Sequence, residues 1–312
     1  MTIQLLSRTS IDDEQWDACV AASANSRVYG FSWYLDAVAD QWKGLVLGDY
    51  EAVLPIPHNR KLVLRSIYTP IFAQQLGIYA QVALSPQMVG EFMQAIPTKK
   101  FHKISIAFTN ETGILLPQKN RTPLTNLVLP LDASYEKIYE GFSKNTKRNI
   151  KKSQARNLKV IADLNSTQLL ELFKQNRGAE LNNPPSFYEA MGKIMTAAAD
   201  QKIGTFYGAV NVHAEIEAAL FVVTVGQRIY NLFPVNTAPG RENGALFLLF
   251  DELIRVYSES NNTLDFEGSM IPGVARFYGG FGSQEETYYR WEEENMNALL
   301  KWGLRVYRKT KE

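Results

Sequence analysis

The second half of the chain alternates most clearly between strand-like apolar runs and stretches whose apolar residues recur at helical spacing. Six runs are expected to form strands: LKVIAD, GTFYGAVNV, EIEAALFVVTV, QRIYNLFPV, TLDFEG and EETYYRW. Helices are expected over residues 134–157, 166–181, 186–199, 243–258, 272–278 and 295–307. After the first helix, the order is therefore strand, two helices, three antiparallel strands, helix, strand, helix, strand and a closing helix. A tight Gly226-Gln227 turn joins the last two antiparallel strands.

The first half has a shorter version of this order. Apolar residues recur at helical spacing over 12–22 and 32–41, and the strands LVLG, YEAVLPI and KLVLRSIYT follow, the last two separated by a Pro-His-Asn turn. In SPQMVGEFMQAI, Ser85 suits the N-cap of a helix and Pro86 its first position. HKISIAF and NLVLPL are the closing strands. We expect a mixed α+β protein with domains 1–130 and 131–312.

Composition narrows the function classes. The chain has 312 residues with 46% hydrophobic and 21% charged, which is typical of a globular protein with two ordinary domains. Its 33 Lys and Arg nearly balance its 32 Asp and Glu, so no long-range field favours DNA or a membrane surface. A lone Cys19 excludes an internal disulfide, and three scattered histidines predict no metal site. No signal peptide or transmembrane segment is expected, which predicts a cytoplasmic protein.

A candidate ligand site lies where the strand ending at Val235 leads through a small-residue loop into an apolar helix. Backbone N–H groups and the positive end of the helix dipole gather at such a start, and they can bind a pyrophosphate. Gly244 and Ala245 would let phosphates approach the backbone. An ordinary capped helix after a loop explains the same residues almost as well.

The element order, together with three local patterns, resembles the GNAT N-acyltransferase superfamily. The patterns are SKNTKRNIKKSQARNLKV, the helix after VGQRIYNLFPVN, and LDFEGSMIPGVARFYGGFG. Two such units in one chain resemble the Fem-type transferases, which add amino acids to peptidoglycan precursors. The resemblance implies two tandem GNAT-like domains, each a mixed, largely antiparallel sheet flanked by helices. No long antiparallel helical arm interrupts the second unit, so an acyl-coenzyme A donor is favoured over aminoacyl-tRNA.

The resemblance also implies where the donor binds. GNAT enzymes hold coenzyme A with an Arg/Gln-x-x-Gly-x-Gly/Ala loop before a helix, and strands that splay apart accept its pantetheine arm. Arg241-Glu242-Asn243-Gly244 matches the first four positions, whereas Leu246 stands where a small residue is expected. The residues expected to bind the donor are Val223, Val225, Arg241, Asn243, Gly244 and Ala245.

Several carboxylates are candidates for the base that removes the proton of an attacking amine. Asp265 and Glu267 lie two apart in a strand, which puts both on one face, and burial would raise the pKa of either. Glu217 is unusual in so apolar a run. The resemblance implies that Tyr278 is the acid for the leaving group. The structural alternative is an ion pair, for example between Arg276 and Glu267.

Acceptor-binding residues are sought in two places. Residues 144–159 carry seven basic and no acidic side chains, and Lys144 and Arg148 fall on one helical face. They suit a phosphate-rich acceptor, whereas a solvated face or RNA binding are the alternatives. The remaining acceptor candidates are Arg276 and, in the first domain, Tyr29, Trp33, Gln74 and Gln75, which could equally pack a domain interface.

The leading hypothesis is an N-acyltransferase or aminoacyltransferase that acts on a small-molecule or cell-wall-precursor amine. Direct transfer is expected because the sequence has no Gly-x-Ser-x-Gly nucleophile elbow. A GNAT-fold binding protein without turnover is the alternative, and Leu246 favours it. An RNA-associated protein is a third hypothesis, against which the balanced net charge argues.

Overall fold

The computed structural model describes residues 2–61, 63–178, 183–268 and 270–296, which form two compact units. Unit 1 comprises Met1–Leu124 and the segment that begins at Tyr288, and unit 2 comprises Thr125–Thr287. The domains expected from the sequence, 1–130 and 131–312, differ from these units at two strands. The strand β7 (Arg121–Pro130) pairs within unit 2, and the strand β14 (Gln284–Glu294) pairs within unit 1.

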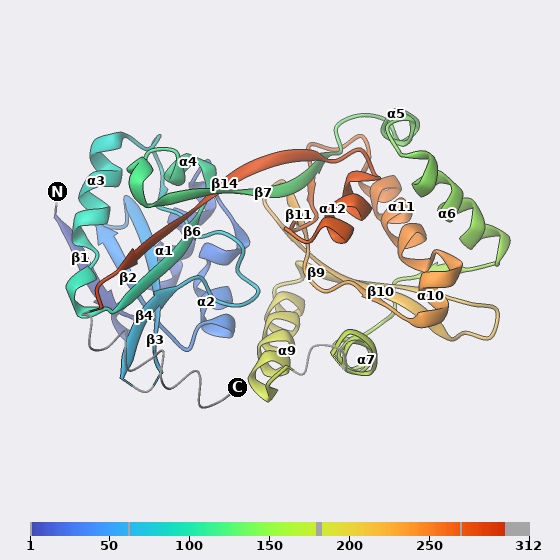
Figure 1. Cartoon of the computed structure of the whole chain (residues 1–312), viewed down its shortest axis with the longest axis horizontal. Coiled ribbons are helices and arrows are strands. Elements are labelled where there is room, and N and C mark those ends of the chain that lie inside the picture. The colour runs from blue at the N-terminus through green and yellow to red at the C-terminus, as the bar shows by residue number, and fades with distance from the viewer. Residues whose placement is uncertain (1, 62, 179–182, 269, 297–312) are drawn as a thin grey trace. The chain divides into compact units, whose positions relative to one another are not determined.

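Unit 1 contains a mixed sheet in the order β1-β2-β3-β4-β6-β14, with β5 beside β3 (Figure 1). All recorded pairs are antiparallel except β4 with β6. The strands are β1 (Ile3–Ser7), β2 (Gln41–Leu47), β3 (Ala52–Lys61), β4 (Leu64–Tyr68), β5 (Tyr79–Ala80) and β6 (Lys103–Phe108). The helices are α1 (Asp13–Ala22), α2 (Ser32–Val38), α3 (Pro86–Ala95) and α4 (Asn110–Gly113).

Unit 2 has the corresponding sheet order β8-β9-β10-β11-β13-β7, with β12 beside β10 and with β11 and β13 parallel. The strands are β8 (Lys159–Ile161), β9 (Gly204–Val210), β10 (Ile216–Val225), β11 (Arg228–Asn231), β12 (Val235–Asn236) and β13 (Thr263–Asp265). The helices are α5 (Tyr135–Glu140), α6 (Lys144–Ala155), α7 (Ser166–Phe173), α9 (Pro185–Asp200), α10 (Ala238–Asn243), α11 (Ala245–Tyr257) and α12 (Pro272–Gly279). A π-helical turn, Lys174–Gly178, follows α7.

Local signals fixed several boundaries as predicted. Ser85 caps α3 by accepting a hydrogen bond from Met88 N, and Pro86 is the first helical residue. The Gly226-Gln227 turn joins β10 to β11. The expected Pro-His-Asn turn was wrong, because β3 continues through these residues and pairs Trp42 with Pro57. Among the residues that the structure describes, no strand pairs with the other edge of β3 between its pairings with β5 and β4, so proline is accepted there.

The helix expected over residues 134–157 is two helices, α5 and α6. Gly141, Phe142 and Ser143 separate them: Phe142 packs on Phe281 with ring centroids 5.2 Å apart, and Ser143 caps α6 through Thr146 N. The Ser143 N–H donates to the Gly280 carbonyl at 2.8 Å, which a continuous helix would forbid. The break therefore follows from tertiary packing, which the periodicity of polar residues along the sequence does not reveal.

Helices cover both faces of the unit 2 sheet: α6, α11 and α12 lie on one face, and α7 and α9 on the other (Figure 1). The core under α11 joins alternate β10 residues, Leu220 and Val222, to Leu249 and Leu253 of the helix. None of the helices in the described ranges combines the length and apolarity that a membrane crossing needs. The expected helix 295–307 lies outside the described residues beyond position 296.

Candidate functional site

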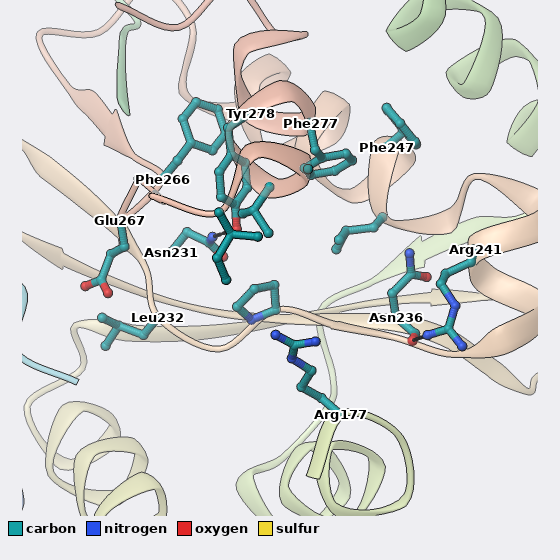
Figure 2. A pocket seen from close by; sticks show the side chains of 16 residues that line it. Arg177, Asn231, Leu232, Asn236, Arg241, Phe247, Phe266, Glu267, Phe277 and Tyr278 are labelled. Carbon is teal, nitrogen blue, oxygen red and sulfur yellow. Dashed lines mark hydrogen bonds between the residues drawn. The ribbon is translucent and has the colours of Figure 1, made fainter. Parts of the chain in front are cut away.

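A cavity of about 590 Å³ opens in unit 2 where the two parallel strands part (Figure 2). β11 and β13 pair through Arg228–Tyr230 and Thr263–Asp265. Beyond this pairing, the segment from Asn231 to Asn236 lines one side of the cavity and Phe266–Gly268 line the other. The helices α11 and α12 complete an apolar wall with Leu246, Phe247, Gly273, Val274, Phe277 and Tyr278. The divergence of the parallel strands therefore creates a space that can receive an extended ligand.

Tyr278 of α12 and Asn231 of β11 meet inside this cavity. The Asn231 Nδ2 atom donates a hydrogen bond to the Tyr278 hydroxyl oxygen at 3.0 Å. Burial raises the pKa of Tyr278, the Asn231 bond opposes that rise, and the charge of Glu267 adds to it. The phenol therefore stays protonated at neutral pH, as a general acid must before it acts.

Asp265 lies outside the cavity in a buried cluster of charges. It is fully buried, its Oδ2 is 2.6 Å from Arg228 Nη1, and its Oδ1 accepts from Asn126 Nδ2 at 3.0 Å. Arg228 also binds Glu286 at 2.7 Å. This carboxylate is occupied by structural partners, as the ion-pair interpretation of the sequence predicts.

Glu267 has different surroundings because β13 ends at Asp265, so the two carboxylates do not share a strand face. Glu267 adopts a left-handed conformation with φ of 54°, and its N–H donates to Asp265 Oδ1 at 2.8 Å. The next N–H, of Gly268, donates to Asn126 Oδ1 at 2.6 Å. A Cβ at Gly268 would lie 2.4 Å from Leu127 N, so only glycine fits. Two buried side chains thus hold the turn that brings Glu267 to the cavity (Figure 2).

Glu217 organises the loop before α10 and does not line the cavity. Its carboxylate accepts hydrogen bonds from Asn243 Nδ2 at 2.9 Å and from Asn211 Nδ2 at 3.4 Å. Its carbonyl oxygen accepts from the Thr237 N–H at 3.0 Å, and a Cβ at Gly240 would lie 2.1 Å from that oxygen. The hydrogen bonds that Glu217 accepts from Thr237 and Asn243 therefore hold the chain from β12 to the end of α10 close to β10.

The expected donor-binding residues separate into two groups. Arg241 lines the cavity and donates from Nη1 to the Asn236 carbonyl at 3.0 Å. The expected helix over 243–258 is α11, and the loop expected before it contains the short helix α10, which ends at Gly244. Gly244 has φ of 79°, and a Cβ there would lie 2.7 Å from the Asn149 carbonyl of α6. Ala245 is fully buried. The start of α11 is therefore packed on α6 at Gly244 and reaches the cavity with Leu246 and Phe247.

Val223 and Val225 are part of the sheet and do not line the cavity. Val223 is fully buried in β10 opposite Tyr230, and Val225 pairs with Arg228 beside the hairpin turn. Their side chains point to the face opposite Val222, which packs in the core under α11.

Three polar residues of the cavity were not among the site residues predicted from the sequence: Arg177, Asn231 and Asn236. Asn231 is a polar residue within the apolar run QRIYNLFPV, a signal that could have identified it. Arg177 extends from the π-helical turn and reaches the cavity from the side opposite Tyr278 (Figure 2). No pattern in the sequence indicated that turn, although π-helical turns are frequent at functional sites.

The basic helix lies beside a second cavity of about 640 Å³. Arg276, Asn145 and Thr146 line this cavity. On α6, Lys144 is exposed, and Arg148 donates to Asn145 Oδ1 at 2.7 Å. Arg276 and the start of α6 are thus neighbours, whereas Lys144 and Arg148 face solvent.

Unit 1 is closed at the point where unit 2 is open. Its parallel strands β4 and β6 correspond to β11 and β13, but the chain after β4 continues to bind β6. The Thr69 N–H donates to Ser105 O at 3.1 Å, Thr69 Oγ1 accepts from Ala107 N at 2.7 Å, and Leu76 N donates to Ala107 O at 2.8 Å. These bonds join the chain after β4 to β6, whereas the corresponding chains of unit 2 part around the cavity.

The expected acceptor residues of unit 1 are distributed around this closed region. Tyr29 is fully buried against Tyr34, with ring centroids 5.6 Å apart, and Trp33 is partly buried. Gln75, 1% exposed, donates to Gln74 Oε1 at 2.6 Å. Gln74 lines a smaller cavity of about 350 Å³.

Comparisons with known proteins rest on structure, because no protein-family profile and no curated sequence matches the chain. FemX is similar over 93% of this chain and 97% of its own, with a TM-score of 0.68 and 10% identity. L-PGS from Bacillus licheniformis has a TM-score of 0.57 and 11% identity, covering 95% and 96% of the two chains. A tandem GNAT protein from the clavulanic acid biosynthesis pathway has a TM-score of 0.53 and 11% identity, covering 95% and 100%. The chain therefore has the α+β, tandem GNAT fold that FemX also has, over nearly its whole length.

Proposed function

We propose that this protein is an acyltransferase that binds an acyl-coenzyme A in the unit 2 cavity and transfers its acyl group to an amine. The observation that carries the proposal is the parting of β11 and β13 around a cavity that contains Tyr278, Asn231 and Glu267. A pantetheine arm is a narrow, extended chain, which suits a space between diverging strands. The closure of the corresponding space in unit 1 restricts the proposal to unit 2.

The polar groups of the cavity suit the two halves of the reaction. The amine nitrogen attacks the thioester carbonyl and loses a proton to Glu267, the carbon–sulfur bond breaks, and the thiolate takes the proton of Tyr278. Arg241 lies at the other end of the cavity from Glu267, and Arg177 lies on the side opposite Tyr278 (Figure 2). Both would bind the phosphates of the donor. No covalent intermediate with the protein is required.

The acceptor is proposed to be a small-molecule or cell-wall-precursor amine. The FemX-like fold supports this class, as does the second cavity beside Arg276, which could take an anionic part of such an acceptor. An aminoacyl-tRNA is the competing donor of the same reaction class. It would use the exposed basic residues of α6 for the phosphate backbone.

A binding protein without turnover is the second candidate function. Leu246 favours it, because its side chain occupies a cavity-lining position where the GNAT loop has a small residue. Both candidates predict donor binding, but only the first predicts product.

The test is a transfer assay with acetyl-CoA, succinyl-CoA and alanyl-tRNA as donors and a set of primary amines as acceptors, with the products measured by mass spectrometry. Tyr278→Phe is expected to lower kcat about 100-fold with donor affinity retained. Tyr135→Phe is the matched control, because Tyr135 is partly buried and its hydroxyl donates to Asp251 away from the cavity. Donor binding without product would support the binding protein, and full activity of Tyr278→Phe would contradict the proposed role of the tyrosine.

A further inference from the structure

Asn231 has one hydrogen-bonding atom that the fold does not use. Its side chain is 2% exposed and lines the cavity, and its Nδ2 donates to Tyr278. Its Oδ1 is buried and has no hydrogen-bond partner within the described ranges. A buried carbonyl oxygen without a partner destabilises the protein, which indicates that a ligand completes the bond.

The surroundings of this oxygen specify the partner. An amide oxygen only accepts, so the ligand atom must carry a hydrogen. Figure 2 shows Asn231 beside Tyr278, with Glu267 and Leu232 on its other side, and the carboxylate of Glu267 disfavours an anion there. A primary amine carries N–H groups and can therefore donate a hydrogen bond to Asn231 Oδ1.

We infer that Asn231 binds the attacking amine through Oδ1 and directs the Tyr278 proton through Nδ2. Because Nδ2 donates to the phenol oxygen, the phenol must donate its own proton elsewhere, toward the cavity. In the tetrahedral intermediate of acyl transfer, the entering nitrogen and the leaving sulfur are bonded to one carbon. The Oδ1 and Nδ2 atoms of Asn231 are likewise bonded to one carbon. A single side chain can therefore align the entering amine through Oδ1 and the Tyr278 hydroxyl, which protonates the leaving sulfur, through Nδ2. This inference rests on the proposed function.

Two variants separate the two roles. Asn231→Asp keeps an acceptor for the amine but cannot donate to Tyr278, whose hydroxyl would turn toward the new carboxylate. We expect kcat for transfer from acetyl-CoA to n-butylamine to fall about 100-fold, with KM for the amine within about three-fold. Asn231→Leu removes both functions, so KM for n-butylamine should also rise about five- to ten-fold. In a Tyr278→Phe background, Asn231→Asp should cost less than about three-fold in kcat.

Equal losses from Asn231→Asp in the two backgrounds, or an unchanged KM in Asn231→Leu, would overturn the inference. A merely structural asparagine would lower the melting temperature of both variants without this division between kcat and KM. Asn236→Leu is the comparator in the same cavity, near Arg241, and should weaken acetyl-CoA binding while KM for the amine stays within about two-fold.

A readout without turnover keeps the inference separate from the proposed function. The side-chain amide resonances of Asn231, identified by their loss in Asn231→Leu, should shift when n-butylamine is added to the ¹⁵N-labelled protein and also in Tyr278→Phe. Absence of both shifts would overturn the inference even if acetyl-CoA binds. If the resonances shift but no donor produces a product, the proposed transfer fails and the amine site remains.

Discussion

Arg228 is a cation held almost entirely inside unit 2 by two acids and their neighbours. Its side chain is 15% exposed and binds Asp265, which is fully buried, and Glu286, which is 24% exposed. The same cluster includes Asn126, whose amide oxygen accepts from the Gly268 N–H. A buried ion pair contributes little net stability, but the loss of one partner leaves a charge uncompensated. At the residue scale, the main effect of the cluster is therefore to hold the Glu267–Gly268 turn in place, through Asp265 and Asn126.

Asp265→Asn tests this arrangement. The change preserves the side-chain shape but leaves Arg228 with Glu286 as its charged partner, so the free energy of unfolding should fall by about 3 kcal/mol. Denaturant unfolding measures the loss. Glu286→Gln is the control, and the more exposed position should give a smaller loss. Equal losses at the two positions would contradict the buried-cluster account.

Asp251 gives a prediction about pH. Burial raises its pKa, although the Tyr135 hydrogen bond and Arg255 oppose the rise. A raised pKa means that the folded protein binds the proton more tightly than the unfolded chain, whose value is about 3.9. The free energy of unfolding contributed by Asp251 is therefore fully present below that value and is lost as pH rises through the folded pKa.

Asp251→Asn should remove this dependence. The stability of the variant relative to wild type is expected to increase as pH rises across that interval and to be constant above it. Chemical unfolding at a series of pH values measures the difference. Glu252→Gln, a neighbouring and more exposed acid, is the control. If the stability of Asp251→Asn relative to wild type stays constant or falls as pH rises, burial does not raise the pKa of Asp251 as this account requires.

Sequence reasoning identified the chemistry-bearing residue types but not their neighbours. Glu267 and Tyr278 were both named, and both line the unit 2 cavity. Asp265 was named as a second candidate base because strand alternation was assumed to continue past it. The strand ends there, and the left-handed turn at Glu267 depends on Asn126, which is distant in sequence. Such long-range hydrogen bonds cannot be inferred from spacing.

At the scale of elements, two helix breaks determine where the unit 2 helices lie. Gly141–Ser143 separates α5 from α6, and Gly244 separates α10 from α11. The breaks are related, because Gly244 fits directly against the Asn149 carbonyl of α6. The sequence pattern predicted one helix over 134–157 and one over 243–258, but neither the break at Gly141–Ser143 nor the short helix α10 before Gly244. Both breaks depend on the close approach of another element, which a sequence pattern does not reveal.

Gly244→Ala should therefore be strongly destabilising. The new methyl group would meet the α6 backbone and would also force alanine into a conformation with φ of 79°, so a loss of more than about 2 kcal/mol is expected. Gly226→Ala separates the two causes, because Gly226 has φ of 58° and nothing within 4 Å of its Cβ position. Its loss should be about 1 kcal/mol, from strain alone. Similar losses in thermal or denaturant unfolding would argue against the α6 contact.

At the scale of the whole molecule, two units with corresponding strand orders differ at one place. In unit 1 the chain after β4 returns to β6 and binds it, whereas in unit 2 the chains after β11 and β13 diverge around the cavity. The repeated element order was visible in the sequence, but the difference depends on backbone hydrogen bonds of Thr69 and Leu76. We therefore expect a chain with two GNAT-like units to bind only one donor.

The most direct test of this account is isothermal titration of the whole chain with acetyl-CoA. We predict one molecule bound per chain, and loss of binding in Gly273→Trp, because Gly273 lines the cavity and has open space for the indole. Gly192→Trp is the matched control, at a helical glycine with the same open space outside the cavity, and it should bind as wild type does. Two molecules per chain, retained binding in Gly273→Trp, or no binding by the wild type would contradict the account.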